Sequence, residues 1–264
     1  MRFGVVLVSP KYPGNVGSVI RLMANFGLRI LHIVDPRADL SDPAVASMAS
    51  GGDARVRVKI FGTLPEALRP FHAVLATSSG RGRRRPPLQP FSELEGFIAG
   101  LPAKSKIALL FGAEDRGLSQ EEMALAHAVF RIPTRPAFPV MNLAQAVALV
   151  LHAAVPAARA DGPAEMEPLA TTKELEALFG HLRATLLDIG FLNEPNPDHI
   201  LADLRQMALR ARLGPRDVLI LRGILRQVKN YPRVLESRRR AATGRSHGRD
   251  GPAPVSSRGS GSGH

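Results

Sequence analysis

Short apolar runs alternate with segments of helical period over residues 1–158, and this alternation restricts the fold more than any other feature of the chain. Strands are expected at residues 3–8, 30–34, 56–61, 73–76, 107–111 and 129–132. Helices are expected from Val16 to a stop at Gly27, near residues 65–68, from Ser119 to about His127, and after the N-cap residue Asn142. Strands that alternate with helices predict an α/β domain whose parallel sheet is covered on both faces.

The remainder of the chain has a different pattern. Residues 159–171 are rich in Ala, Pro and Gly and are expected to form a linker. Helical segments at residues 173–189, 197–212 and 215–229 predict a small all-helical extension over residues 172–232. Their apolar stripes are Leu175, Leu178, Leu182 and Leu186; Ile200, Leu204 and Met207; and Leu221, Ile224 and Val228. Arg, Gly, Ser and Pro dominate residues 233–264, which predicts a basic disordered tail.

The composition excludes several classes of protein. Hydrophobic residues make up 45% of the 264 residues, which is enough for a sizeable core. No apolar run is long enough to cross a bilayer, so we expect a cytoplasmic protein with no membrane partner. The absence of cysteine excludes disulfides and thiolate metal sites, and the 8 histidines lack the spacing of metal ligands, so we expect no metal.

The charge of the chain favours a polyanionic partner. The net charge is +12 and the sequence pI is about 11.1, which favours nucleic acid first and an anionic membrane second. Part of the excess lies in the arginine-rich segment 81–85, which could bind phosphates because a guanidinium binds a phosphate through two parallel hydrogen bonds. A solvated basic loop is the plainer alternative for this segment.

Open parallel sheets bind their ligands beyond the carboxyl ends of the strands, which makes four loops candidate sites. They are Pro13-Gly14-Asn15-Val16-Gly17-Ser18 with Arg21 one turn into the helix; Thr77-Ser78-Ser79; Gly112-Ala113-Glu114-Asp115-Arg116-Gly117; and the apolar loop from Ile132-Pro133 to Pro139-Val140-Met141-Asn142. Glycines let the backbone approach a ligand closely, and the stiff fourth loop could surround a flat aromatic ring. Each loop also has a plainer interpretation: turn glycines, a solvated arginine, a structural carboxylate, or a simple strand-to-helix connection.

Two other classes of function stay open at this point. A nucleotide-dependent oxidoreductase would carry G-x-G-x-x-G after the first strand, which Gly14-Asn15-Val16-Gly17 does not fit, although Asp35 lies near the position of a ribose-binding acid. A non-catalytic nucleic-acid-binding protein could use the C-terminal helices as its reading module. No Ser-His-Asp order or strong general base stands out, so a catalysed reaction should depend on geometry more than on proton abstraction.

Three of the four loops, in their order along the chain, resemble the motifs of the SPOUT class, specifically its SpoU/TrmH-like RNA ribose 2′-O-methyltransferases. The motifs are Asn15, Gly17 and Arg21 closed by Phe26-Gly27; Gly112-Ala113-Glu114 followed by Gly117-Leu118-Ser119; and Ile132-Pro133 followed by Met141-Asn142-Leu143. Val140 and Met141 stand where the family usually has Ser, so one hydroxyl contact to the cofactor or the RNA is missing. Residues 186–191, 221–225 and 77–85 resemble the TrmJ-like tRNA branch of this family.

The resemblance implies a deep trefoil knot at the C-terminal end of the first domain, and a homodimer whose active sites borrow residues across the interface. It implies S-adenosyl-L-methionine as the cofactor, bound by Thr77, Ser78, Ser79, Gly112, Ile132, Pro139, Val140, Met141 and Asn142. The implied catalytic residues are Arg21, which would orient the phosphate beside the ribose and lower the pKa of the 2′-hydroxyl, Asn15, which would hold Arg21 or the ribose, and Glu114, which would fix the active-site loop. Arg81, Arg83 and Arg84 would contact RNA phosphates. The expected substrate is tRNA at the first nucleotide of the anticodon loop, position 32, with rRNA as the alternative.

Overall fold

The computed structural model describes residues 2–79, 87–158, 167–192 and 197–246. Its N-terminal part is a seven-stranded sheet in which every pairing is parallel. The strand order is β3 (Arg57–Phe61), β2 (Ile30–Val34), β1 (Arg2–Val8), β6 (Lys106–Phe111), β4 (Ala73–Ser78), β7 (Ala128–Arg131) and β5 (Leu88–Pro90). The six predicted strands are therefore confirmed. The seventh, β5, has three residues, which is too short for a periodic pattern to reveal.

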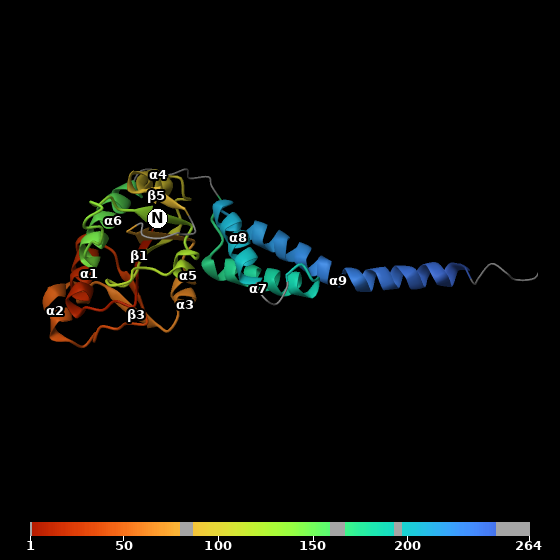
Figure 1. The fold of residues 1–264 in the computed structure, drawn as a ribbon, viewed down its shortest axis with the longest axis horizontal. Helices are drawn as coiled ribbons and strands as arrows, with labels where there is room; N and C mark the ends of the chain where they lie inside the picture. Colours follow the sequence, from red (N-terminus) through yellow and green to blue (C-terminus); the bar gives the residue numbers. More distant parts are fainter. Residues whose placement is uncertain (1, 80–86, 159–166, 193–196, 247–264) are drawn as a thin grey trace, which may run out of the picture.

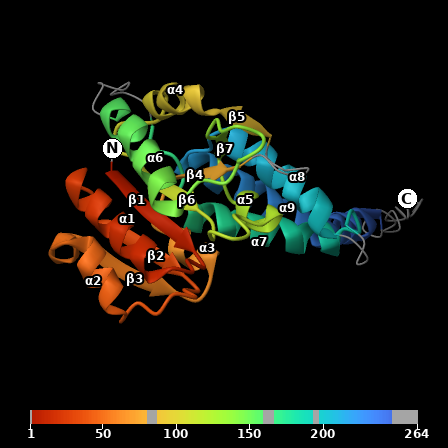
Figure 2. The same ribbon diagram turned by 60° about the vertical axis from the view of Figure 1, so that its left-hand side comes forward.

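Helices cover both faces of this sheet (Figures 1 and 2). One face carries α1 (Pro13–Asn25), α4 (Leu94–Ala99) and α6 (Leu143–Ala157), and the other carries α3 (Leu64–Leu68) and α5 (Gln120–Met123). The helix α2 (Pro43–Ala49) packs against α1. Short 3₁₀ turns lie at Gly52–Ala54 and Phe91–Glu93. The predicted helix after Ser119 is shorter than expected, because it ends at Met123 rather than near His127.

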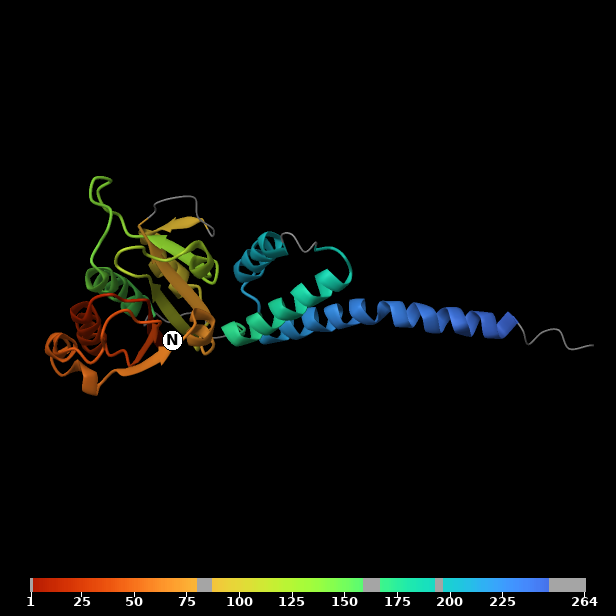
Figure 3. The ribbon, with the colours of Figure 1, turned by 60° about the horizontal axis from the view of Figure 1, so that its bottom comes forward.

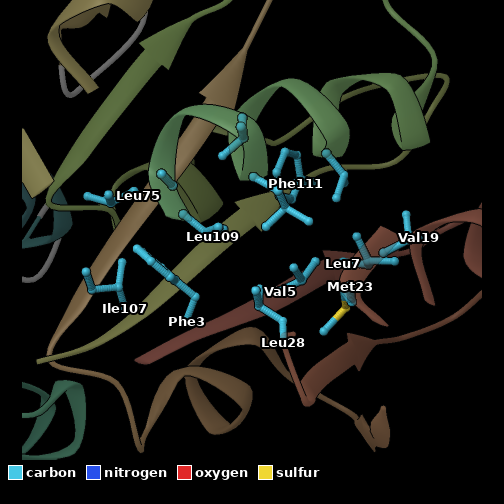
Figure 4. Close-up of a cluster of buried hydrophobic side chains, with 14 of the residues drawn as sticks. Phe3, Val5, Leu7, Val19, Met23, Leu28, Leu75, Ile107, Leu109 and Phe111 are labelled. Atoms are coloured by element: carbon cyan, nitrogen blue, oxygen red, sulfur yellow. The ribbon is translucent and has the colours of Figure 1, made fainter. Parts of the chain in front are cut away.

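The inner strands β1, β2, β4, β6 and β7 are mostly buried, as their apolar runs predict, whereas the edge strands β3 and β5 are largely exposed or half-buried. Side chains alternate along β1, so Val5 and Leu7 enter the core under α1 and α6, whereas Val6 and Val8 enter the core under α3. Figure 4 shows the first of these cores, where Leu7 and Val5 of β1 face Val19 and Met23 of α1. Both cores are continuous across the strands, which holds the carboxyl ends of the strands at one rigid edge.

The strand order reverses beside β1. From β1 the chain builds β2 and β3 outward on one side, and it then places β6 and β4 on the other side. The carboxyl ends of β1 and β6 therefore meet at a topological switch point, where open sheets leave a crevice for a ligand. The trefoil knot that the family resemblance implies for the loops at this edge stays a prediction.

The C-terminal part contains three helices, α7 (Thr172–Asp188), α8 (Pro197–Arg210) and α9 (Pro215–Ser246). Their common core is small and consists of Ala170, Leu175, Leu178, Phe179, Leu209 and Val218. The predicted stripes on α8 and α9 do not supply most of it, because Ile200, Met207, Leu221, Ile224 and Val228 are exposed to solvent. In a three-helix unit of this size, one narrow stripe on each helix is enough to close the core.

The expected disordered tail is wrong for residues 233–246, because α9 continues to Ser246 and projects past α7 and α8 (Figure 3). Leu, Glu, Arg and Ala are good helix formers, so this segment continues the helix although it is highly charged. Residues 247–264 lie outside the described chain. Of the expected linker, residues 159–166 also lie outside it, and Thr171 forms the capping box that begins α7.

Candidate active site

A cavity opens at the carboxyl edge of the sheet, where β4, β6 and β7 end. It contains about 910 Å³ of empty space, including space open to solvent. Its wall includes Thr77, Ser78, Ser79, Gly112, Ile132, Pro139, Val140 and Met141, together with Phe111, residues 113–118, Thr134, Leu143 and Ala146. Of the residues predicted to bind the cofactor, Asn142 alone is outside this wall.

The segment 112–118 forms a tight hairpin on one side of the cavity. Ala113 and Gly117 form an antiparallel bridge, in which the Gly117 amide donates to the Ala113 carbonyl at 2.8 Å. Gly117 has φ +68°, and a Cβ on Gly112 would lie 2.2 Å from the Gly117 carbonyl carbon. A larger residue at Gly112 would collide with the hairpin backbone, and one at Gly117 would be strained by the positive φ. The hairpin therefore presents backbone, and the Glu114 carboxylate, to the cavity at close range.

The loop 132–142 forms the opposite side. Ile132 is buried, Met141 packs against the core, and the Thr134 hydroxyl donates to the Pro139 carbonyl at 3.2 Å, which ties the two ends of the loop together. Thr134 was missed by the sequence analysis; its place directly after Ile-Pro was the available signal. Val140 is 49% exposed, so the position where the family usually has Ser faces the opening of the cavity rather than its floor.

A chain of hydrogen bonds joins three segments that are far apart in the sequence. The Asn15 side-chain amide donates to Glu114 Oε1 at 2.8 Å, and the Asn142 side-chain amide donates to Asn15 Oδ1 at 2.9 Å. Asn142 Oδ1 in turn accepts from the backbone amides of Ala144 and Gln145, as its predicted N-cap role requires. The structure thus brings Asn15, Glu114 and Asn142 together at the edge of the cavity.

Glu114 lies at one end of this chain and also binds backbone amides of another segment. Its Oε2 accepts from the Lys11 amide at 2.8 Å, and its Oε1 also accepts from the Tyr12 amide at 3.4 Å. These bonds fix the loop between β1 and α1 against the hairpin that follows β6. Two carboxylate oxygens therefore hold two backbone donors and the Asn15 amide in one arrangement.

Arg21, by contrast, is not brought into this group. It is exposed, and it lines a separate apolar hollow formed by α1, α2 and α6, with Leu22, Met48, Ala144 and Ala148 around it. Gly17 was expected to belong to a turn or an anion-binding loop, but it lies inside α1 and has a packing role. A Cβ there would lie 2.4 Å from the Val45 carbonyl oxygen, so Gly17 allows α2 to pack closely on α1.

An ion pair at the cavity was not predicted. Arg37 binds Asp115 through two hydrogen bonds of 2.7 and 3.0 Å and also donates to the Ser9 carbonyl. The Arg37 guanidinium lowers the pKa of the Asp115 carboxyl to about 2. Lys11 lies 3.9 Å from the same carboxylate. The hairpin thus keeps a negative charge beside Arg37 and Lys11, because Asp115 stays ionised far below neutral pH.

The arginines that were predicted to bind RNA are not placed by the structure. Arg81, Arg83 and Arg84 lie outside the described residues. Over the described part of the chain, no group of three or more His, Cys, Asp or Glu side chains has the arrangement of a metal site. Within the same ranges, no helix is long and apolar enough to span a membrane.

The architecture and these motifs define a class of protein, and a comparison with known families agrees. Residues 2–152 match the model of the SpoU rRNA methylase family, so the chain belongs to that family. Residues 173–243 match the C-terminal domain of the tRNA methyltransferase TrmJ. This second match extends through most of α9, in agreement with its length here. Membership of a methylase family decides against the nucleotide-dependent oxidoreductase.

Individual relatives cover nearly the whole chain. The tRNA (cytidine/uridine/adenosine-2′-O-)-methyltransferase TrmJ of Pseudomonas aeruginosa is 35% identical over 90% of this chain and 98% of its own length. The tRNA (cytidine/uridine-2′-O-)-methyltransferase TrmJ of Salmonella typhimurium is 34% identical over 85% of this chain and 95% of its own. The crystal structure of TrmJ from Z. mobilis superimposes with a TM-score of 0.75, at 31% identity over 87% of this chain and all of that one. The chain is thus a homologue of tRNA 2′-O-methyltransferases across both of its parts.

Proposed function

We propose that this protein methylates a ribose 2′-hydroxyl of tRNA with S-adenosyl-L-methionine, at the first nucleotide of the anticodon loop, position 32. The observation that carries the proposal is the hydrogen-bonded chain Glu114–Asn15–Asn142 beside the cavity, since it unites all three family motifs at one site. The identity to tRNA 2′-O-methyltransferases over both parts of the chain supports the same reaction class and substrate.

The cavity suits an adenosine-containing cofactor. Apolar side chains of Leu118, Ile132 and Met141 can contact the two faces of an adenine ring, and the hydroxyls of Thr77 and Thr134 offer polar contacts. The close approach of backbone at Gly112, where a Cβ would collide, leaves main-chain groups accessible to the ligand. When bound, S-adenosyl-L-methionine supplies a methyl group on a positively charged sulfur.

The protein then has to orient the ribose hydroxyl and exclude other nucleophiles. Asn15 is fixed at both ends of its side chain, by Glu114 and by Asn142, so its position is set before the RNA binds. Glu114 is occupied by backbone and amide donors, which makes it a positioning residue rather than a general base. Arginine stays protonated at neutral pH, so Arg21 would bind the phosphate beside the ribose rather than accept its proton.

The position of Arg21 favours a shared active site in a homodimer. In one chain Arg21 lines a hollow between α1, α2 and α6, where Met48 and Leu149 are exposed apolar side chains on the neighbouring surface. A two-fold contact through this surface would cover them and carry Arg21 of each copy toward the cavity of the other. We therefore propose that the second copy supplies Arg21 to the Glu114–Asn15 pair.

Methyl transfer from labelled cofactor to unmodified tRNA and rRNA transcripts tests the proposed function. Incorporation is expected into tRNA, at a ribose 2′-oxygen, and Arg21→Ala should abolish it. Methylation of rRNA instead would favour the alternative that the family description names. Incorporation into neither RNA would refute the catalytic proposal and leave a nucleic-acid-binding protein.

A mixture of two inactive variants tests the shared site. In a heterodimer of Arg21→Ala with Asn15→Ala, one site would combine the intact Asn15 of one copy with the intact Arg21 of the other. Random exchange of subunits should therefore restore roughly a quarter of the wild-type activity, because half of the dimers carry one of two sites. If Arg21 acts within its own chain, the mixture stays inactive.

A further inference from the structure

Tyr12 is an exposed aromatic residue whose presence the fold does not explain. It is the N-cap of α1, and its side chain makes no capping hydrogen bond, although Ser, Thr, Asp or Asn would cap this helix better. Tyr12 is 51% exposed, so it adds little to the core. A residue that serves neither the helix nor the core is a candidate for contact with a ligand.

Tyr12 adjoins the wall of the cavity. The Tyr12 amide donates to Glu114 at 3.4 Å, and Glu114 lines the cavity. Lys11 Nζ is 5.4 Å from the centre of the Tyr12 ring and 3.9 Å from Asp115, which also lines the cavity. Two independent contacts therefore place Tyr12 beside the hairpin that carries Glu114 and Asp115.

The surroundings of the ring suit a nucleotide. Lys11 carries a positive charge on an exposed side chain within reach of a phosphate bound near the ring. Single-stranded RNA is bound through such combinations, in which an aromatic face stacks on a base and a nearby cation contacts its backbone. The Tyr12 backbone is fixed by Glu114, so the ring is presented on a held segment rather than on a free loop.

We propose that Tyr12 is a stacking platform for a nucleobase of the RNA substrate, at or next to the nucleotide that is methylated. This inference rests on the proposed function and extends it to how the nucleotide is held. Every base has a π-face, so stacking accepts different bases.

Tryptophan fluorescence gives a direct measurement, because the chain contains no tryptophan and only two tyrosines. In Tyr12→Trp the indole is expected to be quenched when an unmodified tRNA transcript binds. Tyr231→Trp on α9 is the matched control, since Tyr231 is similarly exposed at 57%. Unchanged emission of Tyr12→Trp at saturating tRNA, or equal quenching in both variants, overturns the proposal.

Kinetics provide a second readout. Tyr12→Leu should raise the KM for tRNA about 5- to 150-fold, the range that base–aromatic stacking produces, while the Kd for S-adenosyl-L-methionine stays within about twofold. Tyr12→Phe keeps the aromatic face and should keep the wild-type KM. A wild-type KM in Tyr12→Leu overturns the platform even though the enzyme methylates RNA. A wild-type enzyme that methylates no RNA refutes the proposed function instead, and the fluorescence titration then still decides whether Tyr12 stacks on bound tRNA.

Discussion

The side-chain amide of Asn142 donates a 2.9 Å hydrogen bond to Oδ1 of Asn15, which ties the N-terminus of α6 to the first turn of α1. Each asparagine has a further task, since Asn142 caps its own helix and Asn15 donates to Glu114. The contact therefore makes the position of Asn15 depend on the loop 132–142, which ends at Asn142 and forms one side of the cavity. A change in that loop on cofactor binding would reach Asn15 through this bond.

Two substitutions of Asn142 should separate its roles. Asn142→Ala removes the cap and the bond to Asn15, and should cost about 1 kcal/mol of stability as well as activity. Asn142→Asp keeps a capping oxygen but cannot donate to Asn15, so urea unfolding should stay near wild type while methyl transfer falls about tenfold or more. Wild-type activity in Asn142→Asp would show that the bond to Asn15 is dispensable.

Glu114→Gln should harm the site in a different way. The new amide would direct N–H groups at the Lys11 amide or at Asn15, which are themselves donors, so at least one of the present bonds is lost. We expect a loss of about 1–3 kcal/mol in unfolding free energy and a fall in the rate of methyl transfer. Glu121→Gln, on an exposed carboxylate of the neighbouring helix, is the control and should change neither measurement appreciably.

Several of these relationships were predictable from the sequence, because their signals are local. The N-cap role of Asn142, the capping box at Ser119 and the stop at Gly27, which has φ +76°, follow from residue types at fixed spacings. Most strands were identified by short apolar runs, and parallel order followed from their alternation with helices. Because the three motifs follow strands of one parallel sheet, the sequence also predicted that they meet at one edge of that sheet.

The features that the sequence did not predict depend on contacts between segments that are distant along the chain. Nothing local in Gly17 shows that α2 packs on it, and nothing near Arg21 shows that it faces a different hollow from Asn15. The apolar stripe of α9 predicted a helix but not which of its faces is buried, because Val218 and Leu225 pack whereas Ile224 is exposed. Side-chain pairing across the sheet edge is fixed by the tertiary fold, which periodicity does not specify.

His127 should make the stability of the fold depend on pH. Burial, followed by the nearby positive charge of Arg212, lowers its pKa to about 4. Its Nδ1 accepts a hydrogen bond from the Val74 amide at 3.1 Å, which requires this nitrogen to be unprotonated. The unfolded chain binds a proton near pH 6.5, so this contribution is fully present above that pH and is lost as the pH falls from about 6.5 to 4.

The unfolding free energy measured at a series of pH values tests this. The contribution of His127 is at most about 3 kcal/mol, and the lowered pKa values of His32 and His72 act in the same direction. His127→Asn should therefore flatten the decline between pH 6.5 and 4, whereas His152→Asn, at an exposed position, should leave it unchanged. An identical decline in His127→Asn and wild type would contradict the assignment.

Arg212 should hold the C-terminal helices to the methyltransferase domain. It lies between α8 and α9, donates to the Gly100 carbonyl at the end of α4 at 2.7 Å, and stacks over the Phe97 ring at 4.7 Å. Phe97 in turn packs edge-on against Phe130 of β7, next to the cavity residue Ile132. Arg212→Ala removes both contacts and should lower the unfolding free energy by roughly 1–3 kcal/mol.

Hydrogen exchange shows whether that loss is at the contact between the two parts. In Arg212→Ala the amides of α4 should exchange faster, while Arg210→Ala, at an exposed neighbouring arginine, should leave α4 unchanged. Arg212→Ala also removes a positive charge beside His127, so the pKa of His127 should rise. Part of the pH dependence of the unfolding free energy should then disappear. Unchanged exchange in α4 together with an unchanged His127 titration would show that Arg212 does not couple the helices to the domain.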